Sequence, residues 1–334
     1  MRLVERRTTL ISILLGGAIL LAAVAPLHRA AAQNPPPPDN QTSQQAGKIQ
    51  VQVSLVNLFA TVRDNHRAIV GDLTKDDFKI FEDDQLQKLA FFQKDVTMPI
   101  TLGLMVDTSG SQQNLLGLEQ VAAERFFQKV MRKGDEAMVL DFDTDVNLLA
   151  DFTEDQDALD HAVERTQINS PIGMGPMSRD NDRSTAMYDA IYVACNEQLA
   201  GQAGRKALIL MTDAMDEGSK VGMKDAIEAA QRADTVVHFI LIAEPGAYGM
   251  LGYNGGSVAK KIAEETGGRV IDANGGRKLD EAFDQISEEL RSQYVLGYYP
   301  TNPARDGTFR RLKVETDKSG LKVLARHGYY APKR

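Results

Sequence analysis

The feature that most constrains the fold is a series of short apolar segments that alternate with helical segments between residues 97 and 292. Three segments, 100–106, 207–211 and 236–242, are almost wholly apolar. Strands have this composition when helices cover both faces of a parallel sheet. Helical spacing occurs between them at 115–131, 155–166, 185–199, 221–233, 258–265 and 279–290. The pattern predicts a doubly wound, Rossmann-like α/β fold for residues 97–292.

The two segments that flank this region have the alternation of β-strands. Strand candidates are 49–55, 56–62, 78–81 and 89–92 before the region, and 294–299, 311–316 and 322–330 after it. Each flank has too few strands for a stable core of its own. We therefore predict that residues 49–95 and 293–334 pair into one small β-sandwich, into which the α/β region is inserted.

The first 48 residues read as targeting and linker sequence. Arginines at positions 2, 6 and 7 precede an apolar run at 10–24, and three alanines end at position 32. This order predicts a signal peptide over 1–32, because the run is short for a membrane span of about 20 residues. The proline-rich segment 33–48 predicts an extended linker. We expect a secreted or periplasmic protein, which is membrane-anchored if the segment stays uncleaved.

Composition argues against several classes of function. The net charge of −8 is unfavourable for a protein that binds nucleic acid by neutralising phosphates. Cys195 is the one cysteine, so a multi-cysteine zinc site is excluded, and we expect a buried, inert thiol. His238 lies within a strand candidate and is expected to be a satisfied core histidine. Ser109 has no evident base, and the nucleophile-elbow, P-loop and HExxH motifs are absent, so we expect neither an enzyme nor a small-molecule substrate.

Oxygen-bearing side chains follow two of the buried strand candidates. Asp107, Ser109 and Ser111 come directly after 100–106, and Asp213 follows 207–211. Thr185 begins a helical segment after a long loop. Open α/β sheets bind ligands at the carboxyl ends of strands where the strand order reverses, so Asp107 and Asp213 share one crevice if their strands flank that point. Carboxylates and hydroxyls suit Mg²⁺, Mn²⁺ or Ca²⁺.

The pattern Asp107-x-Ser109-x-Ser111, with Thr185 and Asp213, resembles the metal-ion-dependent adhesion site of von Willebrand factor type A (VWA) domains. The sequences around Thr185 and Asp213, and those at 142–146 and 152–153, extend this resemblance over about 97–290. The flanks resemble VWFA-related proteins of Acidobacteria. The resemblance implies that the serines and the threonine bind an ion directly or through water, and that the aspartates often do so through water. It also implies an open position that accepts a carboxylate of a partner protein.

The resulting hypothesis is an exported, non-enzymatic adhesion module that docks an Asp or Glu of a partner protein through a divalent ion, most simply Mg²⁺. Two alternatives stay open: a structural or assembly protein in which the ion only stabilises the fold, and, as the weakest, a metal-dependent phosphatase. Two glycine-containing loops, 169–184 and 246–256, are candidates for a partner-binding rim. The rim residues would be Met174, Met177, Tyr248 and Tyr253.

Overall fold

The computed structural model describes residues 55–94, 98–169, 185–242, 255–273 and 276–333. The predicted signal peptide, linker and rim residues lie outside these ranges. Val51–Arg334 is one compact unit. Within the described ranges, no helix is long and apolar enough to cross a membrane.

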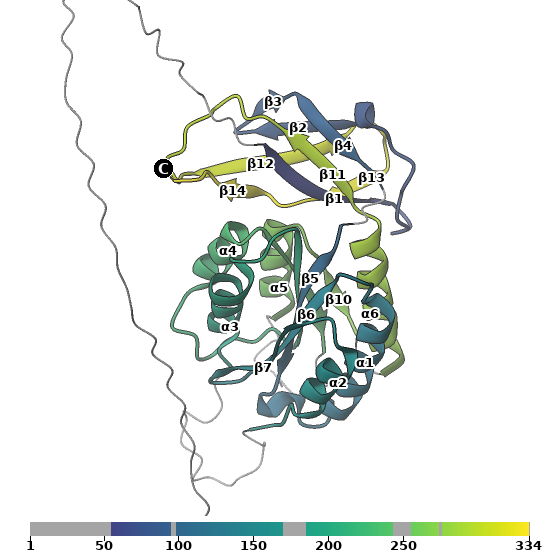
Figure 1. Cartoon of the computed structure of the whole chain (residues 1–334), viewed down its shortest axis with the longest axis vertical. Coiled ribbons are helices and arrows are strands. Elements are labelled where there is room, and N and C mark those ends of the chain that lie inside the picture. Colours follow the sequence, from purple (N-terminus) through teal and green to yellow (C-terminus); the bar gives the residue numbers. More distant parts are fainter. Residues whose placement is uncertain (1–54, 95–97, 170–184, 243–254, 274–275, 334) are drawn as a thin grey trace, which may run out of the picture. The chain divides into compact units, whose positions relative to one another are not determined.

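A six-stranded sheet forms the centre of the α/β part, in the order β10-β9-β8-β5-β6-β7 (Figure 1). All neighbouring strands are parallel except β7, which pairs antiparallel with β6. The strands are β5 (Ile100–Asp107), β6 (Glu136–Phe142), β7 (Val146–Thr153), β8 (Arg205–Thr212), β9 (Thr235–Leu241) and β10 (Val270–Asp272). Every residue of β5 and β8 is buried, as expected for inner strands covered on both faces.

Two groups of helices cover the two faces of this sheet (Figure 1). One apolar core contains residues of α1 (Leu116–Val130), α2 (Gln156–Glu164) and α6 (Gly276–Arg291). The other contains residues of α3 (Met187–Val193), α4 (Met223–Arg232) and α5 (Gly255–Thr266). Cys195 is buried in the second core, within a π-helical turn, Ala194–Leu199, that continues α3. The predicted doubly wound α/β fold is confirmed.

The strand order reverses between β5 and β8. The chain runs outward from β5 through β6 to β7, and then returns to the other side of β5 as β8 before it continues to β9 and β10. β5 and β8 are direct neighbours, with Val106 opposite Met211. The two strands whose ends have the candidate site residues therefore flank the switch point, where open α/β sheets bind ligands.

The flanking segments form two four-stranded antiparallel sheets, β13-β1-β11-β4 and β14-β12-β2-β3. The strands are β1 (Val56–Asp64), β2 (Phe78–Glu82), β3 (Gln85–Gln87), β4 (Leu89–Gln93), β11 (Tyr294–Tyr298), β12 (Phe309–Thr316), β13 (Leu321–Leu324) and β14 (Gly328–Tyr330). β1 pairs with β11 and β13, and β2 pairs with β12, so each sheet combines strands from both ends of the chain. One apolar core joins the sheets, as predicted for the sandwich.

Two details of the sandwich differ from the sequence prediction. The single strand expected over 322–330 is wrong, because the chain leaves one sheet after β13 and enters the other as β14. Contacts with the α/β part hold this crossing: Arg326 pairs with Asp234, and the His327 amide donates to the Glu265 carbonyl. The short polar strand β3 was not predicted. It forms because Asp83 and Asp84 adopt positive φ angles, 46° and 64°, in the tight turn after β2.

Candidate metal centre

The loop after β5 is held by hydrogen bonds to the end of the sheet. The Asp107 carboxylate accepts a hydrogen bond from the Ser109 amide, at 2.9 Å, and another from the Thr212 hydroxyl, at 2.5 Å. The Thr108 amide donates to the Phe142 carbonyl at the end of β6. Residues 110–112 then form a 3₁₀ turn that leads to α1. This arrangement fixes the orientation of the Asp107 carboxylate.

Ser111 links this loop to the end of β8. Its Oγ donates to Asp213 Oδ2 at 2.6 Å and lies 3.0 Å from the Oγ of Ser109. Asp213 also accepts a hydrogen bond from the Met215 amide, at 2.9 Å. The structure therefore brings the oxygens of Ser109, Ser111 and Asp213 together at the carboxyl edge of the sheet.

Thr185 reaches the same edge through its backbone. Its carbonyl accepts from the amides of Glu217 and Gly218, in the segment after β8, and the next amide, of Ala186, donates to Asp143. Thr185 is buried. Within the described ranges, no hydrogen bond joins its hydroxyl to the other four candidate side chains. Thr185 is thus placed by backbone hydrogen bonds to the β6–β7 turn and to the segment after β8.

Ala214, directly after Asp213, has a left-handed backbone. Its φ is +57°, and its amide donates to the Thr212 hydroxyl at 2.9 Å. L-residues other than glycine adopt this conformation at a cost of about 1–2 kcal/mol. The alanine methyl group is buried in the second apolar core, and its burial opposes this cost.

Burial of like charges dominates the electrostatics of the site. Asp107 is fully buried and Asp213 nearly so. Loss of hydration, together with the charge of Asp213, raises the pKa of Asp107 to about 7, although hydrogen bonds from Ser109 and Thr212 oppose the rise. A site with this charge and an all-oxygen donor set is suited to a hard divalent cation.

Two functional candidates at this edge were missed in the sequence. Thr212 orients the Asp107 carboxylate, and its position directly before Asp213 was the available signal. Glu119, in the first turn of α1, is fully buried, and neither of its carboxylate oxygens has a hydrogen-bond partner. Its helical spacing from Leu116 and Ala123 places it on the apolar face of α1, which was the signal for burial.

The donor set differs from that of a metal site built from three or more acidic, histidine or cysteine side chains. No such group occurs among the described residues. The candidate centre instead combines two carboxylates with hydroxyls, which fits Mg²⁺, Mn²⁺ or Ca²⁺ and not zinc or copper. Asp107, Ser109, Ser111, Thr185 and Asp213 are the residues that would hold the ion.

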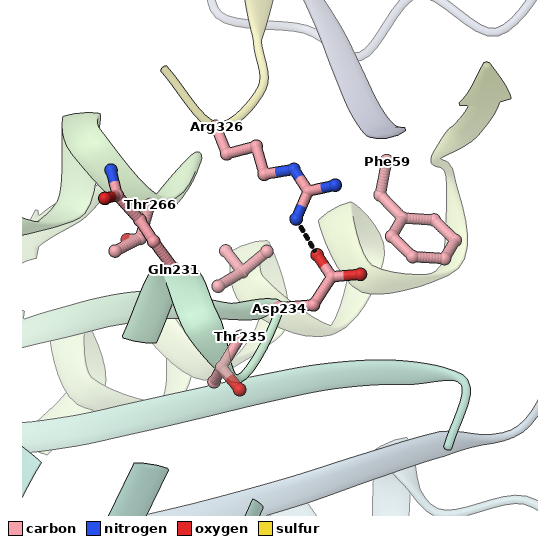
Figure 2. Close-up of a pocket in the computed structure, with 7 residues that line it drawn as sticks. Phe59, Gln231, Asp234, Thr235, Thr266 and Arg326 are labelled. Carbon is pink, nitrogen blue, oxygen red and sulfur yellow. Dashed lines mark hydrogen bonds and ion pairs between the residues drawn. The ribbon is translucent and has the colours of Figure 1, made fainter. Parts of the chain in front are cut away.

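Two hollows elsewhere in the described residues are too small for a ligand. Each has a volume of about 10 Å³, close to the minimum for a single water molecule. One lies between Phe59, Asp234 and Arg326, where the Arg326 guanidinium pairs with the Asp234 carboxylate (Figure 2). These hollows belong to the packing between the sandwich and the α/β part, not to a binding site.

A family comparison supports the fold assignment. Residues 102–216 match the family model of the von Willebrand factor type A domain. The chain contains a VWA domain. The matched range includes Asp107, Ser109, Ser111, Thr185 and Asp213. The narrower resemblance of the flanks to acidobacterial proteins stays a prediction. Among curated proteins, none matches the sequence significantly.

Three solved structures illustrate the similarity of this chain to known folds. BatB from Bacteroides thetaiotaomicron is 18% identical, covers 58% of this chain and all of its own (100%), and has a TM-score of 0.43. A von Willebrand factor type A protein from Catenulispora acidiphila is 13% identical over 84% of this chain and 74% of its own, with a TM-score of 0.46. Proximal thread matrix protein 1 from the mussel byssus, described with a zinc-occupied MIDAS motif, is 14% identical over 63% of this chain and 49% of its own, with a TM-score of 0.48.

Proposed function

We propose that the VWA domain binds a divalent cation through Asp107, Ser109, Ser111, Thr185 and Asp213, and uses it to dock an acidic side chain of a partner protein. The protein is then a non-enzymatic adhesion or binding module. The signal-peptide pattern of residues 1–32 supports export, to the periplasm or the cell exterior.

The linkage of the two strand ends at the switch point carries this proposal. Ser111 joins the loop after β5 to Asp213 after β8, beside the buried carboxylate of Asp107. Two buried acids at one edge are costly without a counter-charge, and a cation supplies it. A hard divalent ion keeps water or an external oxygen among its ligands, and a partner carboxylate is a strong ligand of that kind.

Calorimetric titration with Mg²⁺ and Mn²⁺ tests the metal site. We expect saturable binding at one site in wild-type protein and loss of that binding in Asp107→Asn, which preserves the side-chain shape. Thr101→Val, in the same strand but at its opposite end, is the control and is expected to bind like the wild type. Equal binding by Asp107→Asn and wild type would contradict the proposed ligand set.

Capture experiments test the docking step. Immobilised protein with Mn²⁺ is exposed to cell-surface proteins, and the same proteins after their carboxylates are converted to amides form the comparison. We expect capture that is lost on chelation, lost in Asp107→Asn and lost after amidation. Capture that survives amidation would show that the partner is not recognised through an acidic group.

The structural alternative has one observation in its favour. The hydrogen bonds from Ser111 to Asp213 and from Ser109 to Asp107 connect the loop and the strand end without an ion. In that case Asp107→Asn changes only the unfolding temperature in the presence of metal, and partner capture persists. The same two experiments therefore separate the two functions.

The donor set gives no support to catalysis. The polar side-chain partner of Ser109 Oγ is the hydroxyl of Ser111, which is a weak base and does not activate a nucleophile. We propose that the site binds and does not turn over substrate. Release of phosphate from a generic phosphate ester, above that of Asp107→Asn, would contradict this part of the proposal.

A further inference from the structure

Glu119 is a buried carboxylate that the ligand set of the proposed metal site does not use. It lies in the first turn of α1, and both of its oxygens lack a hydrogen-bond partner within the described residues. A buried, unpaired carboxylate is among the most costly groups that a core can hold. Such a group calls for a physical explanation.

Glu119 lies in the first turn of α1, the helix that follows the loop of Ser109 and Ser111. The buried face of α1 packs into a core that also contains Val106, which precedes Asp107, and Met211, two residues before Asp213. Burial, and then the charges of Asp107 and Asp213, raise the pKa of Glu119 well above its usual range. The three carboxylates therefore interact, and no basic side chain contributes to this shift of Glu119.

A role at the start of the helix does not explain Glu119. Acidic residues in a first turn are common because they favour the positive end of the helix dipole. They normally remain at the surface or accept hydrogen bonds from free backbone amides, whereas Glu119 is buried and accepts none. The residue before α1, Leu115, likewise has no side-chain cap. Neither a surface charge nor a capping role accounts for the residue.

We propose that Glu119 is a positioning residue of the metal centre, a buried carboxylate whose charge strengthens the binding of a divalent cation at Asp107 and Asp213 without being a ligand. This inference rests on the proposed metal site. Charge interactions act over longer distances in a poorly hydrated interior than in water, so a carboxylate outside the ligand set still attracts the ion. Groups behind the ligands commonly influence metal affinity in this way.

The test compares Glu119→Gln with wild type in two measurements on the complete chain. Glutamine has nearly the same shape but no charge. We expect the Kd for Mn²⁺, measured by calorimetry, to rise roughly 10-fold or more, as for other groups behind metal ligands. We also expect the unfolding temperature of the metal-free protein, followed by circular dichroism, to stay the same or rise, because the substitution removes a buried acid that has no hydrogen-bond partner among the described residues.

Two further variants serve as controls. Glu124→Gln removes one carboxylate from the same helix, but the residue is partly exposed and its charged neighbours are Asp160, Glu164 and Arg125. It is expected to leave the Kd unchanged. Glu119→Asp retains the charge, although one methylene group further back, and is expected to recover part of the affinity.

The outcomes separate this inference from the proposed function. Wild-type affinity in Glu119→Gln overturns the inference and leaves the metal site intact. A weaker affinity accompanied by a lower metal-free unfolding temperature shows a purely structural role and also overturns it. If the wild type binds no metal, the proposed function fails, and the inference fails with it.

Discussion

Single side chains decide how the candidate metal centre is oriented. Asp107 is not free to rotate, because its two oxygens accept from the Ser109 amide and the Thr212 hydroxyl. The Thr212 hydroxyl in turn accepts from the Ala214 amide, so one hydroxyl connects β5 to the backbone after β8. Pre-orientation of this kind lowers the entropic cost of binding an ion.

Thr212→Val tests this orienting role. Valine has nearly the same volume but leaves Asp107 Oδ2 and the Ala214 amide without a partner. We expect the Kd for Mn²⁺ to rise roughly 10-fold, as for other groups behind metal ligands, and the free energy of unfolding to fall by about 1–3 kcal/mol. Calorimetry and denaturant unfolding measure the two effects. Thr101→Val, at the other end of β5, is the control, and an unchanged Kd in Thr212→Val would contradict the role.

His238 is buried in β9, as predicted, but the expectation of a satisfied histidine is wrong. Within the described residues, neither ring nitrogen has a hydrogen-bond partner. Burial lowers the pKa of His238 below 6.5. The nearby charges act in opposite directions, because Glu289 raises this pKa whereas Arg269 and Arg63 lower it. Glu289 forms ion pairs with both arginines, which explains why its carboxylate does not pair with the imidazole.

The lowered pKa predicts a loss of stability in mild acid. As the pH falls below 6.5, His238 becomes protonated in the unfolded chain before it does so in the folded chain. The unfolded chain therefore binds more protons, and a lower pH favours unfolding. We expect His238 to contribute up to about 1.4 kcal/mol per pH unit to the slope of the free energy of unfolding against pH. His238→Leu should flatten unfolding free energy against pH between pH 7 and 5, relative to wild type. His66→Gln, at an exposed site, is the control and should keep the wild-type slope. If His238→Leu also keeps the wild-type slope, His238 is not the source of the pH dependence.

At the level of elements, two consecutive glycines after α5 allow close backbone contacts, one with the sandwich and one with β9. Gly267, after α5, has a φ of +86°, and a Cβ there would lie 2.6 Å from the Arg326 backbone nitrogen. At Gly268 a Cβ would lie 2.0 Å from the Val237 carbonyl oxygen. The crossing between β13 and β14 fits against the end of α5 because Gly267 has no side chain, and Gly268 lets the same segment lie against β9. Arg326 then pairs with Asp234 beside this contact (Figure 2).

Gly267→Ala is expected to disturb this contact. The left-handed backbone and the backbone overlap together should lower the free energy of unfolding by about 2–3 kcal/mol. Gly201→Ala is the matched control, because a Cβ at Gly201 has no neighbouring atom within 4 Å. Denaturant unfolding of both variants checks the prediction. Equal stability of Gly267→Ala and Gly201→Ala would show that the junction is more adaptable than the structure indicates.

At the level of the whole molecule, the sandwich depends on both ends of the chain. β1 lies between β11 and β13, and β2 pairs with β12, so the first flank has no stable partner until the second is present. Arg63 of β1 also binds Glu289 of α6, with an N–O distance of 2.9 Å, and Glu289 is almost fully buried. The sandwich and the α/β part are therefore joined by a buried ion pair as well as by the chain.

Truncation after residue 292 tests this dependence. Without β11 to β14 we expect residues 55–94 to lose their structure, since β1 and β4 lose their partners and only the short β2–β3 pair remains, which is not stable alone. Limited proteolysis followed by mass spectrometry should show cleavage within 55–94 and protection of the α/β part. The intact chain should be protected in both. Protection of residues 55–94 in the truncated chain would contradict the paired sandwich.

Most strands and helices could be predicted from the sequence, but their partners could not. The all-apolar segments at 100–106 and 207–211 match β5 and β8 because strands buried on both faces tolerate few polar groups. The split of residues 322–330 into β13 and β14 was not predictable from local pattern, because contacts of Arg326 and His327 with the α/β part decide it. The helical spacing of Glu119 from Leu116 and Ala123 indicates that it is buried, but only the tertiary structure shows that its neighbours include the charges of Asp107 and Asp213.

The sequence by itself determined the α/β class, the alternating flanks and the polar set that follows the buried strands, because periodicity and composition encode which faces are buried. The tertiary structure decided which strands and which site residues are neighbours. It placed β8 next to β5 and joined Ser111 to Asp213 by a hydrogen bond. It also buried Glu119 where the charges of Asp107 and Asp213 raise its pKa. These relations join residues far apart in the chain, and they follow from strand order and packing, which local pattern does not record.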